Sequence, residues 1–361
     1  MKRTDPDHVY IIAEAGVNHN GQRDLAFALV DVAVRAGADA VKFQTFDAAK
    51  LASKSVSKAA YQKDTTDAAE SQYEMLRKLE LPLEWHHELQ AYAGARGVSF
   101  LSTAFDVDSL AFLQTLDLPF YKIPSGELVN GPLLWQFART RKPLVISTGM
   151  ATLSEVEQGL AIVAHALNAE AEPRDIDAVW RGWSDPAWRA SLQCHVSLLH
   201  CTSQYPTPLA EVNLRAMDTL AGAFGLDVGY SDHTAGILVP VAAVARGAKI
   251  IEKHFTLDRA MAGPDHAASL EPGELVQMVA DIRALQGALG DGAKAPHPSE
   301  WDSRRAGRQQ VVALRPIAAG AHFTRADLGT ARNGRGLAAT ELWALVGQSA
   351  RRAFGAGEVI D

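Results

Sequence analysis

The segment Tyr230-Ser-Asp-His-Thr234 closes one apolar, strand-like run, and Glu252-Lys-His-Phe255 closes the next. Both runs are predicted strands, and residues 237–246 between them are predicted to form an apolar helix. In such a βαβ unit the two strands lie parallel and side by side. We therefore expect His233 and His254 to project from neighbouring strand ends into the same space.

Two imidazoles at adjacent strand ends suit a divalent metal with open positions. A lone histidine at a strand end more often binds backbone or water, and that alternative stays open here. Glu252, two residues before His254, and Asp265 in Gly263-Pro-Asp-His266 add carboxylates and favour the metal. Because cysteine and a clear third ligand are lacking, Mn²⁺ or Mg²⁺ is favoured over tightly held structural Zn²⁺.

The same alternation of apolar strands and helices extends over residues 1–289. The predicted strands are residues 10–16, 40–46, 98–105, 120–127, 143–149, 196–203, 227–232 and 249–255. Eight such units match a (β/α)₈ TIM barrel, whose ordinary size is about 250 residues, with a doubly wound open sheet as the alternative. Residues 47–70 form a polar excursion of a length that is usually functional or disordered. Residues 170–190, rich in Trp, are predicted to be a small helical insertion at the surface.

The composition changes after the predicted barrel. Residues 290–309 are rich in Gly, Lys, Pro, Ser and Arg, which is typical of a linker. Residues 310–361 are predicted to form a small β-rich domain with strands at 311–314 and 353–360 and a helix at 339–345. About fifty residues are marginal for an independent core, so we expect this domain to lean on another surface.

Charge and composition exclude several classes of protein. The chain has 361 residues and a formal net charge of −7, without basic blocks, which argues against a nucleic-acid partner. Two cysteines are too few for a disulfide framework, and the first ten residues lack the apolar region of a signal peptide. No apolar run approaches the ~20 residues of a membrane span. These features predict a cytoplasmic protein with neither a nucleic-acid nor a membrane partner.

A TIM barrel builds its active site at the carboxyl ends of its strands, so polar residues that end the apolar runs are the candidates. A lysine in an apolar strand is costly to bury unless it pairs with an anion, so Lys42 and Lys122 indicate a phosphate or carboxylate ligand. Serine hydroxyls would add directional donors, although a serine at a strand end is as often a helix N-cap. The other candidates are Glu14, Gln44, Ser102, Thr103, Ser125, Glu127, Ser147, Thr148, residues 202–205, residues 231–233 and residues 252–254.

Eight motifs in order along the chain carry a family resemblance. They are Ile12-Ala-Glu-Ala-Gly-Val-Asn-His-Asn-Gly21, Val41-Lys-Phe-Gln-Thr45, Leu101-Ser-Thr-Ala-Phe-Asp106, Lys122-Ile-Pro-Ser-Gly-Glu127, Ile146-Ser-Thr-Gly-Met150, His200-Cys-Thr-Ser-Gln-Tyr-Pro-Thr-Pro208, Tyr230-Ser-Asp-His-Thr234 and Glu252-Lys-His-Phe255. Together they resemble the sialic acid synthase family of nonulosonate synthases. Residues 311–361 are similar to the C-terminal antifreeze-like domain of that family.

The resemblance implies an activity and a set of site residues. Members condense phosphoenolpyruvate with an N-acylated mannosamine-type sugar, use a divalent metal such as Mn²⁺ or Mg²⁺, and release phosphate. By the same resemblance, His233 and His254 are the metal ligands, with the metal polarising the aldehyde of the sugar. The residues that match the phosphoenolpyruvate site are Lys42, Thr103, Lys122, Ser125, Ser147 and Ser231.

The sugar side is also implied by the resemblance. Glu14 and Glu127 match carboxylates close to both substrates, one to orient the sugar and the other to handle a proton for the attacking water, with the assignment open. Asp265 matches a sugar-binding acid, and Tyr205 lies in a motif that lines the same site. Arg332 matches an arginine that the antifreeze-like domain of a partner subunit extends over the acyl group of the sugar. This match implies a domain-swapped homodimer.

The substrate stays open between branches of the family. Residues 58–63 and 70–76 look more like the legionaminic acid branch, which uses 2,4-diacetamido-2,4,6-trideoxymannose, than the N-acetylneuraminate branch, which uses N-acetylmannosamine. A second hypothesis is another phosphoenolpyruvate-dependent synthase acting on an aldose phosphate, against which the antifreeze-like tail argues. A third is a non-catalytic sugar-binding protein, against which the intact candidate ligands and carboxylates argue.

Overall fold

The chain folds into two compact units, the first ending at Gly290 and the second spanning Asp291–Asp361. The computed structural model describes residues 8–54, 56–59, 62–63, 66–67 and 69–361. Residues 1–7 belong to the N-terminal stretch in which no signal peptide was predicted, and they lie outside the described residues. Residues 60–61, in the segment that resembles the legionaminic acid branch, also lie outside them. Among the described residues, no helix combines the length and apolar character needed to cross a bilayer.

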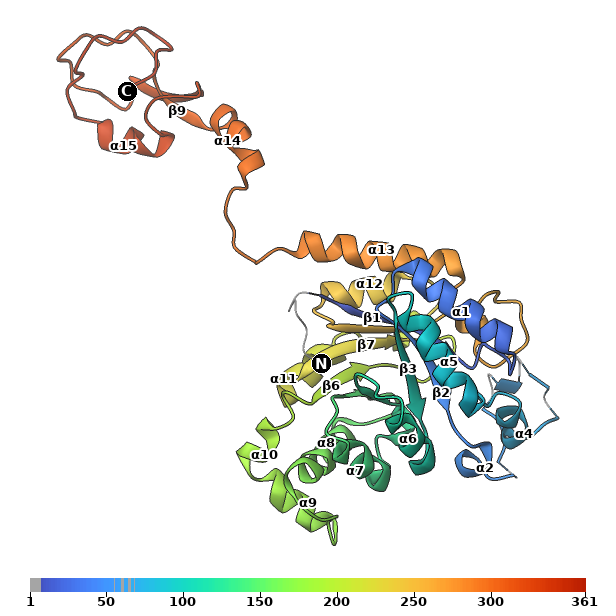
Figure 1. Cartoon of the computed structure of the whole chain (residues 1–361). Helices are drawn as coiled ribbons and strands as arrows, with labels where there is room; N and C mark the ends of the chain where they lie inside the picture. Colours follow the sequence, from blue (N-terminus) through green and yellow to red (C-terminus); the bar gives the residue numbers. More distant parts are fainter. Residues whose placement is uncertain (1–7, 55, 60–61, 64–65, 68) are drawn as a thin grey trace. The chain divides into compact units, whose positions relative to one another are not determined.

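The first unit is built on an eight-stranded sheet in the order β3-β2-β1-β8-β7-β6-β5-β4 (Figure 1). All neighbouring pairs are parallel, and β3 and β4 at the two ends of this order also lie against each other. The sheet therefore curls into a nearly closed barrel, as predicted, and the doubly wound alternative is wrong. The strands are β1 (Tyr10–Gly16), β2 (Ala40–Thr45), β3 (Ser99–Ala104), β4 (Tyr121–Ile123), β5 (Leu144–Ser147), β6 (Val196–His200), β7 (Asp227–Asp232) and β8 (Ile250–His254).

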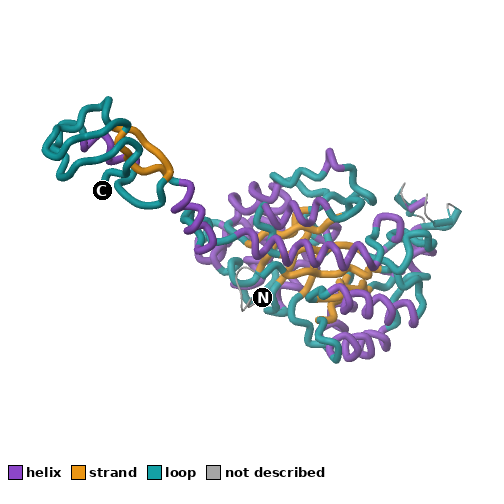
Figure 2. The backbone as a smooth tube through the Cα atoms, turned by 90° about the horizontal axis from the view of Figure 1, so that it is seen from above, coloured by secondary structure: helices purple, strands orange, loops and turns teal. Residues whose placement is uncertain are grey.

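Helices surround the strands (Figures 1 and 2). An extensive cluster of buried aliphatic and aromatic side chains from strands and helices fills the space between the two layers. Local signals place the helix ends: the first helix stops at Gly37, which has a φ of 74°, and Thr152 and Glu155 form a capping box at the start of another. The helices are α1 (Arg23–Ala36), α5 (Leu83–Gly94), α6 (Val107–Gln114), α7 (Gly131–Arg139), α8 (Leu153–Asn168), α11 (Ala216–Phe224), α12 (Leu238–Ala245) and α13 (Pro272–Leu289).

Two excursions leave the regular alternation. Within residues 47–79, the described part holds α2 (Ala48–Leu51) and α4 (Gln72–Arg77). The Trp-rich insertion forms α9 (Ile176–Trp183) and α10 (Pro186–Ala190), which confirms the predicted helical excursion. Its indoles pack against the barrel, since Trp183 donates to Glu157 at 2.9 Å. The insertion is therefore packed structure.

The interior of the barrel is filled in layers, and one layer fixes where the chemistry sits. Its side chains form a buried apolar cluster: Ile12, Ala40, Leu101, Phe120, Val145, Leu199 and Ile250. In β7, the strand that contributes no side chain to this cluster, the corresponding residue is Gly229, where a Cβ would lie 2.3 Å from the carbonyl oxygen of Ile250. Since strand side chains alternate, the residues two positions further along each strand form the next layer toward the carboxyl ends.

The second unit contains β9 (Gln309–Ala313) paired antiparallel with β10 (Leu328–Arg332). It has a small core of its own around Val311, Phe323 and Leu328. Further elements are η4 (Pro298–Glu300), α14 (Trp301–Gly307), η5 (Ala339–Glu341) and α15 (Leu342–Leu345).

Two predictions for this part of the chain need correction. The segment expected to be a linker contains α14. The strand expected at residues 353–360 is absent among the described residues, because a turn forms in which Glu358 accepts from the backbone of Gly355 at 2.7 Å. Single bridges at Phe354 and Val359 remain, and β10, which the sequence did not predict, is the pairing partner of β9.

Candidate active site

The second interior layer of the barrel is polar and comes from all eight strands. Seven members stand two residues after a member of the apolar layer and Ser231 stands two residues after Gly229, and all eight line one cavity of about 490 Å³, a size typical of ligand sites. The layer consists of Glu14, Lys42, Thr103, Lys122, Ser147, Cys201, Ser231 and Glu252. The alternation of strand side chains thus presents two ammonium groups, two carboxylates, three hydroxyls and one thiol to the same space.

The four charged groups of this layer are buried and paired with one another. Lys42 Nζ lies 2.6 Å from Glu14 Oε2 and 3.7 Å from Glu252 Oε2, while Lys122 Nζ lies 3.4 Å from Glu252 Oε1. Hydroxyls complete the network: Lys42 donates to Thr103 Oγ1 at 3.1 Å, and Ser231 donates to Glu252 at 3.0 Å. The two positive charges are therefore balanced inside the protein itself.

The pKa values of the two carboxylates, Glu14 and Glu252, are shifted in opposite directions. Burial raises the pKa of Glu14 to about 7, against the opposing effect of Lys42. Burial acts in the same direction on Glu252, but Lys122 and Lys42 outweigh it and bring the pKa of Glu252 to about 2. Paired groups whose environments push their pKa values apart suit acid and base roles. Glu14 is thus the carboxylate that can exchange a proton near neutral pH.

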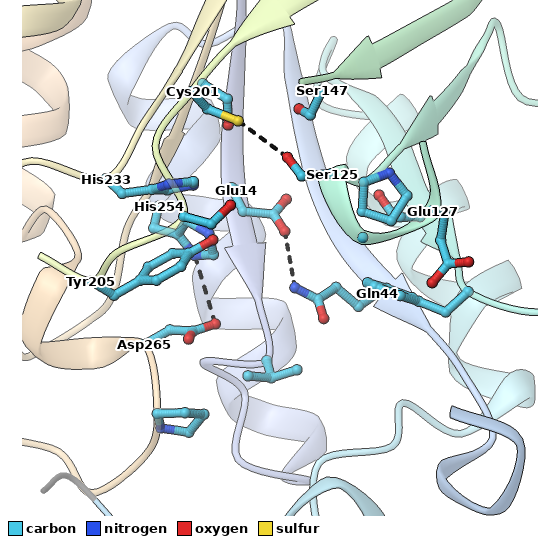
Figure 3. Close-up of a pocket in the computed structure, with 18 of the residues that line it drawn as sticks. Glu14, Gln44, Ser125, Glu127, Ser147, Cys201, Tyr205, His233, His254 and Asp265 are labelled. Atoms are coloured by element: carbon cyan, nitrogen blue, oxygen red, sulfur yellow. Dashed lines mark hydrogen bonds and ion pairs between the residues drawn. The ribbon is translucent and has the colours of Figure 1, made fainter. Parts of the chain in front are cut away.

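A second group of site residues gathers at the ends of β6, β7 and β8. Figure 3 shows His233, His254, Tyr205 and Asp265 together on one side of Glu14. The imidazole centroids are 5.6 Å apart, and the ring of Tyr205 lies 4.1 Å from that of His233. Asp265 Oδ2 is 3.8 Å from His254 Nδ1, and burial raises the pKa of Asp265 to about 6. The predicted meeting of the two histidines is confirmed.

The donor set fits a weakly held divalent ion. His233 Nδ1 lies 2.6 Å from the carbonyl oxygen of Thr202, which can only accept, so the lone pair of His233 is on Nε2. Burial lowers the pKa of both imidazoles, and His233 lowers that of His254 further, so both are neutral as ligands must be. His254 Nδ1 is buried without a hydrogen-bond partner in the described structure. No cluster of three or more His, Cys, Asp or Glu suited to a metal exists among the described residues, so two histidines would leave most positions open.

Behind the histidines, on the outer face of the sheet, lies a separate ion pair. Asp232 and Lys253 are opposite each other on β7 and β8, both fully buried, with Lys253 Nζ 2.5 Å from Asp232 Oδ2. Asp232 also accepts from the backbone and the hydroxyl of Thr234 at 3.1 and 3.0 Å. This network fixes the backbone on both sides of His233.

The opposite side of the cavity carries Ser125 and Glu127 on η1 (Ser125–Glu127), which follows β4. Ser125 Oγ accepts from the backbone of Gly149 at 3.0 Å and lies 3.2 Å from Cys201 Sγ. Glu127 accepts from the side chain of Asn130 at 2.7 Å. Both side chains are therefore held in place by residues that precede the next helices of the barrel.

Twelve of the thirteen residues that the family resemblance assigns to the site line this one cavity. The thirteenth, Arg332, is exposed at the end of β10 in the second unit. The twelve are Glu14, Lys42, Thr103, Lys122, Ser125, Glu127, Ser147, Tyr205, Ser231, His233, His254 and Asp265. Of the other strand-end candidates, six do not line the cavity: Ser102, Thr148, Thr202, Gln204, Asp232 and Lys253.

Two residues of the polar layer were not assigned a role from the sequence. Glu252 was named as a strand-end candidate and as a carboxylate near His254, but its pairing with both lysines was not predicted. Cys201 was noted only for disulfide counting, yet it directly follows β6, lines the cavity and has its thiol 3.2 Å from Ser125 Oγ. The alternation of strand side chains could have identified both residues, because Glu252 and Cys201 each follow an interior apolar residue by two positions. Gln44 also lines the cavity and donates to Glu14 Oε1 at 3.4 Å.

The fold and the site together define a TIM-barrel protein in which a buried layer of lysines, carboxylates and hydroxyls lies beside two neutral imidazoles. The NeuB family model matches residues 29–294, and the SAF domain model matches residues 308–361, where an antifreeze-like domain was predicted. The chain belongs to the NeuB family, which confirms the resemblance seen in its motifs.

Curated relatives and solved structures agree with this assignment. The chain is 44% identical over 360 residues to N,N'-diacetyllegionaminic acid synthase of Campylobacter jejuni, covering 100% of this chain and 99% of that one. It is 34% identical over 343 residues to N-acetylneuraminate-9-phosphate synthase of Homo sapiens, covering 94% and 88%. The N-acetylneuraminic acid synthetase structure from Leptospira borgpetersenii matches with a TM-score of 0.67 and 31% identity, covering 82% and 90%.

Proposed function

We propose that the protein condenses phosphoenolpyruvate with 2,4-diacetamido-2,4,6-trideoxymannose, giving N,N'-diacetyllegionaminate and phosphate. The observation that carries the proposal is the full-length identity of 44% to a synthase with that product, joined to a cavity lined by twelve residues that the family resemblance assigns to the site. A second relative with the same name, from Legionella pneumophila, is also 44% identical and covers 97% of this chain.

Phosphoenolpyruvate would bind on the polar layer of the barrel. Lys42 and Lys122 supply positive charge there, and the hydroxyl of Ser147 is buried without a hydrogen-bond partner in the described structure, so it can donate to a phosphate or carboxylate oxygen. The lysines are already neutralised by Glu14 and Glu252.

The sugar would lie above this layer with its aldehyde toward the two histidines. A divalent ion such as Mn²⁺ or Mg²⁺ held by His233 and His254 would act as a Lewis acid on the aldehyde oxygen. Asp265 and Tyr205 border the same corner and would bind sugar hydroxyls. Glu127, held by Asn130, would orient the sugar from the other side.

The reaction joins carbon 3 of phosphoenolpyruvate to carbon 1 of the open-chain sugar, and water then adds at carbon 2 before phosphate leaves. We assign the proton from that water to Glu14, because its pKa of about 7 lets it accept a proton at neutral pH. Glu252, with a pKa of about 2, stays ionised and serves as the fixed counter-charge of the lysines.

The test is a substrate panel with the pure protein, phosphoenolpyruvate and Mn²⁺, in which phosphate and nonulosonate are both assayed. We expect the diacetamido sugar to give the highest kcat/KM. If no sugar gives product, the proposed function is wrong. If an aldose phosphate is preferred by a large margin, the protein is instead a synthase for phosphorylated aldoses, and binding without turnover would identify a sugar-binding protein.

We further propose a cytoplasmic, domain-swapped dimer in which Arg332 of one subunit contacts the acyl group of the sugar in the other. Support comes from the family motif and from the exposure of Arg332. Losing one charged hydrogen bond costs roughly 1.5–3 kcal/mol, so Arg332→Ala is expected to raise the sugar KM about ten- to a hundredfold and leave that of phosphoenolpyruvate unchanged. Mixing this variant with Glu127→Gln subunits should restore activity in heterodimers. If subunits exchange without restoring activity, the second unit does not act in trans.

A further inference from the structure

One side of the cavity is apolar, in contrast to its floor of charges and hydroxyls. Six side chains both line the cavity and pack into a single hydrophobic cluster, and we call this group the apolar wall. They come from the turn after β1, from the segment that holds α2 and α4, and from the residue after β3. The apolar wall consists of Val17, Leu51, Met75, Leu76, Leu79 and Phe105.

Polar contacts, among them those of one buried lysine, hold the segment that carries much of the apolar wall. Lys58 has a fully buried side chain that donates to Thr66 at 2.7 Å and lies 3.3 Å from Glu70. Directly after Glu70, Ser71 and Glu74 form the capping box that starts α4, the helix of the wall. The ion pair and the cap therefore set the position of α4 relative to the preceding segment. The wall is a built part of the site.

The reaction dictates which part of the sugar reaches this wall. Carbon 1 must meet phosphoenolpyruvate on the polar layer, so carbons 4 to 6 extend away from that layer. Among the described residues that line the cavity, the lysines are Lys42 and Lys122, and both belong to the polar layer. A phosphate on the far end of the sugar would thus face apolar side chains without a lysine to neutralise it, which is costly.

We propose that the apolar wall selects the sugar by its far end, packing against the methyl group of a 6-deoxy sugar and the methyl group of a 4-acetamido substituent. Gln72, on the same helix as Met75 and Leu76, also lines the cavity and offers an amide to the polar part of such a substituent. A hydroxyl or phosphate at carbon 6 would lose its hydration against the wall. This inference rests on the proposed function and adds the residues that set substrate choice.

The test compares the variants Leu76→Asn and Leu51→Asn, which place an amide in the wall from two different segments. The matched control is Leu83→Asn, because Leu83 is half exposed and lies outside the cavity lining. For each folded protein, kcat/KM is measured with the diacetamido 6-deoxy sugar, N-acetylmannosamine and N-acetylmannosamine 6-phosphate, together with the KM of phosphoenolpyruvate. One methyl group in an apolar pocket is worth roughly 10–200-fold in discrimination.

We expect either wall variant to reduce the preference for the 6-deoxy sugar about tenfold, with the phosphoenolpyruvate KM and the control unchanged. If Leu76→Asn fails to fold, Leu51→Asn carries the same test. Equal losses on all three sugars, or an unchanged ratio in a folded variant, would overturn the role of the wall while leaving the proposed function intact. Absence of turnover with every sugar in the wild-type protein would overturn both.

Discussion

Replacing Glu252 by Gln tests the internal charge balance of the site. The substitution keeps an oxygen that can accept from Ser231 but removes the carboxylate that lies 3.4 Å from Lys122 and 3.7 Å from Lys42. Removing one partner of a buried ion pair costs about 3–5 kcal/mol, and Glu14 can offset part of this by ionising fully. We therefore take about 3 kcal/mol for the loss.

That loss corresponds to a decrease in Tm of about 6–12 °C, using about 2–4 °C per kcal/mol for a domain of this size. Phosphoenolpyruvate should reduce the difference in Tm between Glu252→Gln and the wild-type protein, because the anion replaces the missing negative charge beside Lys42 and Lys122. A ligand at 100 times its Kd stabilises by about 2.7 kcal/mol, and a tenfold tighter Kd in the variant would add about 1.4 kcal/mol. Thermal unfolding followed by circular dichroism, with and without saturating phosphoenolpyruvate, measures both effects.

The matched control is Glu84→Gln, which removes the same charge from an exposed position at the start of α5. It should change stability by no more than about 0.5 kcal/mol. If Glu252→Gln melts together with the wild-type protein, Glu252 is not the counter-charge of the lysines. If the ligand stabilises both proteins equally, the anion does not bind beside those lysines.

Three further outcomes follow from the geometry. His254→Ala should abolish turnover and weaken Mn²⁺ binding, measured by electron paramagnetic resonance, with an unchanged far-ultraviolet spectrum; activity that survives chelation would remove the metal from the reaction. Glu14 should be protonated below pH 7 and unable to accept a proton, so kcat/KM should fall as pH decreases through about 7. The Glu14→Gln variant should lose this pH dependence together with most of the activity. Gly149→Ala would place a Cβ 2.7 Å from Ser125 Oγ, so the phosphoenolpyruvate KM should rise about tenfold while the sugar KM changes little; equal effects on both would indicate general damage to the site.

The alternation of strand side chains made much of the barrel readable from sequence. The runs ending at His233 and His254 predicted two parallel strands, and the structure confirms both strands and the meeting of the imidazoles. The cost of burying Lys42 and Lys122 predicted an anionic ligand, whereas the structure pairs both lysines with carboxylates of the protein, and the ligand stays a prediction. The residues that pair with the two lysines could not be identified from the sequence. The pairing of Glu252 with both lysines depends on how the barrel closes, which no local pattern encodes.

Other features depend on packing between distant segments. The apolar wall joins Val17, Phe105 and the short helix α4, and a helix of six residues carries too little periodicity to indicate what it faces. In the second unit, β10 was missed and a strand was wrongly expected at residues 353–360. Strand identity there is decided by pairing with β9, and turn-forming glycines interrupt the apolar run that suggested a strand.

The buried pair of Asp232 and Lys253 restricts how this part of the chain can evolve. Replacing either residue alone leaves an unpaired charge in the sheet and costs about 3–5 kcal/mol, a large share of the 5–15 kcal/mol that keeps a typical domain folded. A double change to apolar residues of similar size can be nearly neutral, but the path to it passes through an intermediate close to unfolding. Lineages are therefore expected to keep or lose the two charges together, as one inherited unit that precedes a histidine of the site on each strand.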